Sequence, residues 1–196
     1  MKDDDYEQLI TDSFSQSVSL LSESAKYSKT ILEISNMIVE CLKNNNKVVL
    51  FGNGGSATDS DHFATELLGR YLLERQSLAA ISITNSATIT AIGNDYGFEN
   101  IFSRQCESLV NENDVVIAIS TSGNSLNVLK GIKLSKKKNA KTIAITGNDG
   151  GKLGKLSDIS LIVTSNSTPR IQEVHRIVIH IICDIVEREF SNVNSN

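Results

Sequence analysis

Apolar positions follow two different periods along this chain, and the change of period divides it in two. In the first 45 residues, apolar side chains recur every three or four positions, as in amphipathic helices. They are Leu9, Phe14, Val18 and Leu21 in one segment, and Ile31, Ile34, Ile38 and Leu42 in the next. Residues 1–45 are therefore predicted to form an N-terminal helical layer, which ends at the polar run 44–46.

From residue 46 to residue 196, short apolar runs alternate with segments of helical period. The runs 47–52, 79–83, 114–119, 141–146 and 159–163 are predicted strands, 86–109, 126–137 and 170–190 are predicted helical regions, and 147–154 is a glycine-rich turn. Such alternation is typical of a parallel sheet with helices on both faces. The predicted fold is α/β, a three-layer αβα sandwich around a five-stranded parallel, doubly wound sheet. We expect one domain, residues 1–196, with the helical layer 1–45 and a core with its C-terminal helix at 46–196.

The last predicted helix is apolar on nearly every side. Pro169 stands at its start, a position that suits proline, and residues 177–183 are apolar apart from His180. A helix of this kind must be buried all round. In a chain of 196 residues, one of the covering surfaces is expected to be another subunit.

Composition excludes several classes of protein. The net charge is −4 without a basic stripe, which argues against nucleic-acid binding, and no apolar run is long enough to span a bilayer. The acidic start of the chain does not resemble a signal peptide. Three scattered cysteines, Cys41, Cys106 and Cys183, are typical of reduced core thiols. These features predict a cytoplasmic protein.

The stretch from residue 47 to residue 70 reads as a strand, a glycine loop and a helix. Gly52, Gly54 and Gly55 permit close approach of a ligand to the backbone, and the helix start that follows attracts anions. A dinucleotide-binding loop would need an acidic residue after the next strand, where Thr84 and Asn85 stand instead. A glycine turn that only joins strand to helix stays open at this point.

A second polar loop leaves the third predicted strand. Four hydroxyl groups occur within its six residues, and the loop has no lysine or arginine. Hydroxyls and helix-start amides form a neutral phosphate cup, which favours a monophosphate over a nucleoside triphosphate. Serines at helix starts are also ordinary N-caps, and Ser125 is a candidate for that role. Four hydroxyls exceed the need for capping, so phosphate binding is the preferred interpretation.

Two of the three histidines have the spacing of a metal or catalytic site. His62 and Glu66 are one helical turn apart, and His180 interrupts an apolar run, where a polar group needs a partner. Gln172 lies two turns before His180 on broadly the same side. Imidazoles and a carboxylate are zinc ligands, whereas glutamine is an uncommon one. Spacing alone does not decide between this zinc site and structural histidines.

These motifs together resemble the phosphoheptose isomerase family of the sugar-isomerase (SIS) domain superfamily. The resemblance covers essentially the whole chain. It rests on the segments at 51–56 (FGNGGS), 62–70 (HFATELLGR), 92–97 (IGNDYG), 119–125 (ISTSGNS) and 170–175 (RIQEVH). The serine-rich loop alone marks only the superfamily, but its combination with His62, Glu66, Gln172 and His180 is much more specific.

The resemblance implies a flavodoxin-like SIS fold, a homotetramer with active sites between subunits, and one zinc ion per subunit. The implied reaction converts sedoheptulose 7-phosphate to D-glycero-D-manno-heptose 7-phosphate, the first step towards the heptose of lipopolysaccharide or surface glycans. Glu66 and His180 would be catalytic, and His62, Glu66, Gln172 and His180 would ligate the metal. The substrate-binding residues would be Asn53, Gly54, Gly55, Ser56, Glu66, Asn94, Asp95, Ser120, Thr121, Ser122, Ser125 and Gln172.

The chemistry suits these residue types. A ketose and an aldose interconvert through an enediol, so a carboxylate can move the carbon-bound proton while an imidazole serves the oxygens. The alternative function is a binding scaffold like the DnaA initiator-associating protein, which shares the fold but lacks counterparts of Glu66 and His180. One departure concerns residues 164–169, because some family members carry an aspartate where Pro169 stands.

Overall fold

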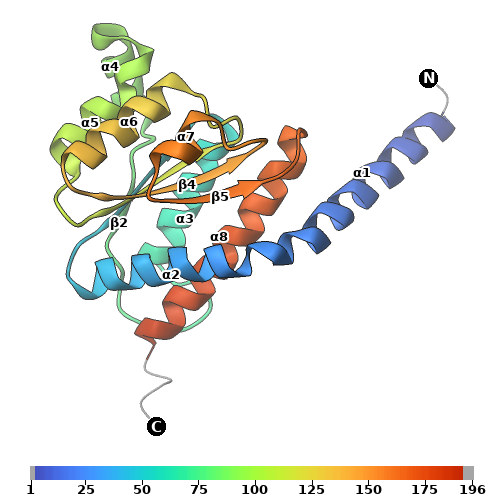
Figure 1. Cartoon of the computed structure of the whole chain (residues 1–196), viewed down its shortest axis with the longest axis horizontal. Coiled ribbons are helices and arrows are strands. Elements are labelled where there is room, and N and C mark those ends of the chain that lie inside the picture. The colour runs from blue at the N-terminus through green and yellow to red at the C-terminus, as the bar shows by residue number, and fades with distance from the viewer. Residues whose placement is uncertain (1–2, 192–196) are drawn as a thin grey trace.

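The computed structural model describes residues 3–191 and contains a five-stranded parallel sheet in the order β2-β1-β3-β4-β5 (Figure 1). The strands are β1 (Val48–Gly52), β2 (Ala80–Ser82), β3 (Val115–Ser120), β4 (Lys141–Gly147) and β5 (Ile159–Val163). The central strands β1 and β3 are buried at every position, whereas the short edge strand β2 is partly exposed. Continuous apolar runs are what a parallel sheet covered on both faces requires, so the predicted doubly wound sheet is confirmed.

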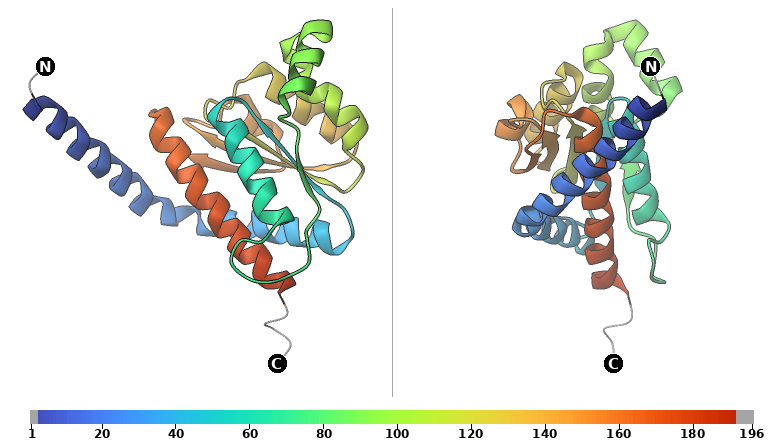
Figure 2. Two further views of the ribbon diagram at one scale, coloured as in Figure 1. Left: turned by 180° about the vertical axis from the view of Figure 1, so that it is seen from behind. Right: turned by 90° about the vertical axis from the view of Figure 1, so that its right-hand side faces the viewer.

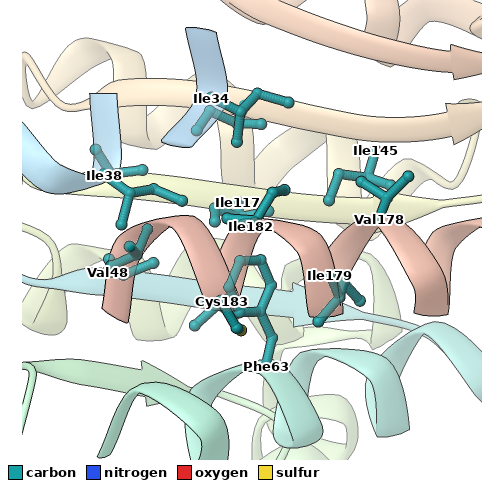
Figure 3. Close-up of a cluster of buried hydrophobic side chains, with 14 of the residues drawn as sticks. Ile34, Ile38, Val48, Phe63, Ile117, Ile145, Val178, Ile179, Ile182 and Cys183 are labelled. Carbon is teal, nitrogen blue, oxygen red and sulfur yellow. The ribbon is translucent and has the colours of Figure 1, made fainter. Parts of the chain in front are cut away.

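Helices pack on both faces of the sheet and form three layers with it. One face carries α2 (Ser28–Lys43), α3 (Gly55–Leu68) and α8 (Thr168–Phe190), and the other carries α5 (Ile101–Leu109), α6 (Leu126–Lys137) and α7 (Gly151–Leu156). Figure 3 shows the first of these cores, where Ile38, Phe63 and Ile182 from the three helices surround Ile117 of β3. Successive strand residues point to opposite faces, so each central strand contributes to both cores.

The N-terminal helix α1 (Asp3–Glu23) does not lie on the sheet but projects from the rest of the chain (Figure 2). A short 3-10 helix, η1 (Ser24–Tyr27), joins it to α2. Arg170, at the start of α8, donates hydrogen bonds to the Ser13 carbonyl and the Ser17 hydroxyl. An exposed apolar stripe runs along α1 and consists of Tyr6, Leu9, Ile10, Phe14 and Val18. The apolar period predicted the helix correctly, but a single chain leaves the stripe uncovered.

The predicted helical region 86–109 is confirmed and divides into α4 (Ser86–Tyr96), the 3-10 helix η2 (Phe98–Asn100) and α5, because Gly97 takes a φ of 86° and ends α4. The predicted turn 147–154 was wrong in part, because it already contains the first turn of α7. Within residues 3–191, no helix is long and apolar enough to cross a membrane.

Candidate active site

The polar loops predicted from sequence meet at the carboxyl edge of the sheet, between β1 and β3. The chain continues from β1 to β2 on one side and reaches β3 on the other, so strand order reverses between these two neighbours. A crevice at such a reversal is the usual ligand site of an open α/β sheet. The loop after β1 opens α3 and the loop after β3 opens α6, so two helix N-termini face the same edge.

An amide pair joins the two loops. Asn53 donates to the Oδ1 of Asn127 at 2.9 Å, and Asn127 donates back to the Oδ1 of Asn53 at 2.9 Å. Asn127 is buried in the first turn of α6 and accepts a further hydrogen bond from the Val128 amide. The sequence analysis missed Asn127, because the partners are 74 positions apart in the sequence and leave no local signal.

The serine loop is held from behind by the turn after β4. Gly147 donates its amide to the Thr121 carbonyl at 3.0 Å, and Leu153 donates to the Gly123 carbonyl at 2.9 Å. A Cβ atom on Gly123, whose φ is 62°, would lie 2.1 Å from the Gly150 carbonyl oxygen. Only glycine therefore fits, and the loop has a fixed backbone.

The serine side chains of this loop lie close to the start of α6. Ser120 and Ser125 place their Oγ atoms 3.4 Å apart, and Ser125 is the N-cap residue of α6 without making a side-chain capping bond. The capping role considered for Ser125 is therefore not used here. Ser122 is exposed and accepts a hydrogen bond from the Asn124 amide at 3.2 Å. Hydroxyls and helix-start amides thus gather at one end of α6.

The two predicted histidines face each other across α3 and α8. The Nε2 atoms of His62 and His180 are 2.8 Å apart, and the Oε1 atom of Glu66 lies 3.5 Å from the Nε2 atom of His62. Burial, and secondarily the positive charge of Arg176, lower the pKa of His62, while Glu66 opposes the effect. At neutral pH, one imidazole can therefore donate its N–H to the other. The structure brings this trio together as the sequence predicted.

Gln172 lies elsewhere along the same pair of helices. It sits over the start of α3, where a Cβ on Gly55 would come within 2.4 Å of its Nε2 atom. Eight residues of helix, about 12 Å of rise, separate Gln172 from His180. Within residues 3–191, no group of three or more histidine, cysteine or acidic side chains forms a metal site.

The donor set nevertheless fits zinc in chemical type. Two imidazole nitrogens and a carboxylate are standard zinc ligands. Nitrogens bound to one tetrahedral zinc lie roughly 3.3 Å apart, so the two rings would have to separate by about 0.5 Å. The trio His62, Glu66 and His180 can approach such an arrangement by side-chain rotation, whereas Gln172 lies farther away in a single chain.

An ion pair that the sequence analysis missed lies between the two parts of the site. Arg176 contacts Asp59 at 2.5 Å, and Asp59 is buried on α3. Burial raises the pKa of Asp59, and the guanidinium of Arg176 partly opposes this. Arg176 lies four residues from both Gln172 and His180, a spacing that could have revealed it. A hollow of about 360 Å³ is lined by Gly55, Thr58, Asp59, Pro169, Gln172, Glu173 and Arg176.

Two predicted substrate residues lie away from the loops. Asn94 and Asp95 are near the end of α4, and Asn94 donates a hydrogen bond to Asp95 at 2.8 Å. Figure 1 shows α4 rising above the sheet, far from α8. Pro169 lies in the first turn of α8 and lines the hollow described above, at the position where the sequence departs from some relatives.

Comparison with known proteins identifies the class of this architecture and then the family. Residues 13–147 match the SIS domain family. The phosphoheptose isomerase of Helicobacter pylori (strain Shi470) is 54% identical over 160 residues, which cover 81% of this chain and 83% of the relative. That of Aliarcobacter butzleri (strain RM4018) is 52% identical over 159 residues, covering 81% and 84%.

Solved structures agree. The phosphoheptose isomerase from Neisseria gonorrhoeae superposes with a TM-score of 0.89 at 37% identity, covering 93% of this chain and 99% of that one. The enzyme from Francisella tularensis gives 0.90 at 38% identity, covering 93% and 98%. The chain is a SIS-domain protein and belongs to the phosphoheptose isomerase family. It is therefore an isomerase rather than the scaffold considered as the alternative.

Proposed function

We propose that this enzyme converts D-sedoheptulose 7-phosphate to D-glycero-D-manno-heptose 7-phosphate through an enediol. The observation that carries the proposal is the trio of His62, Glu66 and His180 on α3 and α8, together with the polar loops at the strand-order reversal where α3 begins. A sugar phosphate needs one end anchored as an anion and the other end exposed to acid–base groups. The two halves of the site supply these two needs.

Glu66 is proposed to move the proton between the two adjacent carbons. His180 is proposed to serve the oxygens, and its contact with the His62 ring orients it for that task. Zinc bound by His62, Glu66 and His180, with Gln172 joining after rearrangement, would polarise the substrate oxygens. The phosphate is assigned to Ser120, Thr121, Ser122 and Ser125, with the loop of residues 53–56 and its Asn53 amide beside them.

The working enzyme is proposed to be a homotetramer with active sites between subunits. The exposed stripe on α1 and the exposed Ile177 and Ile181 of α8 are surfaces that a partner would cover. Asn94 and Asp95 project on α4, so they are proposed to reach the site of a neighbouring subunit. Three buried free thiols suit a reducing cytoplasm, and the product suits heptose supply to lipopolysaccharide or other surface glycans.

The decisive experiment compares two matched changes. Glu66→Gln keeps size but removes the basic carboxylate, and His180→Gln removes the imidazole but keeps a polar group. General acid–base catalysis contributes about 10²–10⁴-fold, so each variant should lose turnover of sedoheptulose 7-phosphate by that factor. Zinc content and substrate affinity are measured on the same proteins. Lost turnover with retained zinc and affinity supports proton transfer, while wild-type rates in both variants would refute the proposal.

A further inference from the structure

The connection between α3 and β2, residues 69–79, is here called the strap, and a buried carboxylate on α8 holds it. Glu187 accepts hydrogen bonds from the backbone amides of Tyr71, Leu72 and Leu73 at 2.8, 2.7 and 2.7 Å. Its side chain is 1% exposed. Three consecutive amides directed at one carboxylate fix the position of the first turn of the strap on α8.

Arg75, also in the strap, supplies the counter-charge and joins the strap to α3. Its Nε atom lies 3.5 Å from Glu187 Oε1, and its guanidinium donates to the carbonyls of Glu66 and Gly69 at 2.7 and 2.9 Å. Burial alone would raise the pKa of Glu187, but the three amides and Arg75 together lower it. Glu187 is therefore a carboxylate at neutral pH and can keep all three hydrogen bonds.

The strap contacts His180 of the site through an aromatic ring. Tyr71 is the first residue held by Glu187, and its ring centroid lies 5.6 Å from that of His180 with a tilt of 32°. His62 contacts His180 at 5.1 Å in an edge-to-face arrangement. The imidazole of His180 thus contacts a ring from α3 and a ring from the strap.

We propose that Glu187 is a positioning residue for His180, acting through Tyr71. Glu187 follows His180 by seven residues, so both project from one side of α8. Glu187 lies two turns after His180 on α8 and fixes the backbone of Tyr71. The ring of Tyr71 in turn contacts the imidazole of His180. The proposal rests on the catalytic role proposed above for His180.

The first test is Glu187→Gln, with Glu189→Gln as the matched control. Glu189 is on the same helix and pairs with Lys43 at 2.9 Å, but both side chains are about half exposed. In Glu187→Gln, the side-chain NH2 group would face backbone N–H groups, which are also donors. Hydrogen bonds would be lost, and the strap would be released. A displacement near 1 Å at a reacting group costs about a hundredfold, so kcat should fall between roughly ten- and a hundredfold. KM should stay within about twofold, because the phosphate loops are unchanged.

The second test separates positioning from simple stabilisation of the fold. Tyr71→Ala removes the ring but keeps the amide that Glu187 binds, whereas Tyr71→Phe keeps the ring. We expect Tyr71→Ala to lower kcat as Glu187→Gln does. Tyr71→Phe should keep the wild-type kcat. The double variant with Glu187→Gln should be no worse than Tyr71→Ala alone, because both changes break one link. If Glu187→Gln does not fold, the contrast between the two Tyr71 variants still decides.

The outcomes distinguish this inference from the proposed function. Wild-type kcat in Tyr71→Ala, additive losses in the double variant, or equal behaviour of Glu187→Gln and Glu189→Gln would each overturn the positioning role. If His180→Gln is inactive at the same time, only the positioning role has failed. If His180→Gln turns over at the wild-type rate, the catalytic assignment fails, and the positioning role with it.

Discussion

Asn53 and Asn127 meet amide to amide, each donating to the other at 2.9 Å, and so join the loop that opens α3 to the first turn of α6. The pair spans the two strands between which strand order reverses. It therefore sets the distance between the two polar loops of the candidate site.

Breaking this pair should weaken substrate binding. Asn127→Asp keeps an acceptor but presents an oxygen to the Asn53 carbonyl, and a buried group left unpaired costs about 1–3 kcal/mol. KM for sedoheptulose 7-phosphate should rise roughly tenfold for about 1.4 kcal/mol. Asn111→Asp, at an exposed asparagine, is the control and should leave KM unchanged. Equal KM values for the two variants would contradict the bridging role.

Gly55 should tolerate a methyl group in folding but not in function. The atom that an alanine Cβ would meet at 2.4 Å is Nε2, at the flexible end of Gln172, which can swing away. Gly55→Ala should therefore unfold at nearly the wild-type temperature while zinc or substrate affinity falls about tenfold. Gly154→Ala, whose Cβ would meet Ile162 at an ordinary 3.4 Å, is the control in thermal melts and binding titrations. Undiminished affinity in Gly55→Ala would exclude Gln172 from the ligand set.

Charges placed in the α1 stripe should dissociate the proposed tetramer. Phe14 and Val18 are 71% and 62% exposed, so Phe14→Glu with Val18→Glu leaves the fold of one chain intact. Burying two carboxylates in an apolar interface is strongly unfavourable. Light scattering at micromolar concentration should report a smaller species than for Gln16→Glu, which adds a charge on the opposite side of α1. A monomeric unmodified protein would refute the tetramer.

His175 should make stability depend on pH between about 4 and 6.5. Its Nε2 atom bonds the Thr146 carbonyl at 3.0 Å, and burial lowers its pKa from 6.5 to about 4. Below pH 6.5, His175 binds a proton in the unfolded chain but stays neutral in the folded chain. Stability that is present at neutral pH is therefore lost on acidification. The loss amounts to about 3 kcal/mol by pH 4.

Denaturant titrations from pH 7.5 to 4 test this expectation. The His175→Gln variant should lose most of the slope between pH 6.5 and 4. Asp158→Asn is a useful comparison, because Lys136 and Thr142 hold the pKa of Asp158 below its usual range despite burial. That variant should be less stable than the unmodified protein at neutral pH, but its slope between pH 6.5 and 4 should be unchanged, because Asp158 titrates only below about pH 4. An unchanged slope in His175→Gln would show that another group titrates.

The elements that sequence predicts well are those whose signal is local. A parallel strand is buried on both faces, so β1 and β3 show as unbroken apolar runs. His180 was identifiable because it interrupts the apolar run of α8. The break between α4 and α5, which the prediction did not place, depends on glycine conformation: Gly97 has a φ of 86° and ends α4, a property that the residue permits but does not dictate.

The missed site residues depend on contacts distant in sequence. Asn127 is defined by Asn53, and Glu187 by the strap more than a hundred residues earlier. Each looks like an ordinary helical polar residue until the fold supplies its partner. Asn94 and Asp95 mark the opposite limit, because their family motif is visible in sequence while one chain leaves them on a projecting helix.

The projecting α1 also has a consequence for the biosynthesis of the enzyme. The stripe from Tyr6 to Val18 is synthesised before the sheet, and even the completed chain leaves it exposed. Until the partner subunits proposed above bind, each new polypeptide exposes this row of apolar side chains to solvent. Exposed apolar surface of this kind promotes chaperone binding and aggregation. Rapid pairing of newly made copies, and hence their abundance at the site of translation, would then govern the yield of active enzyme.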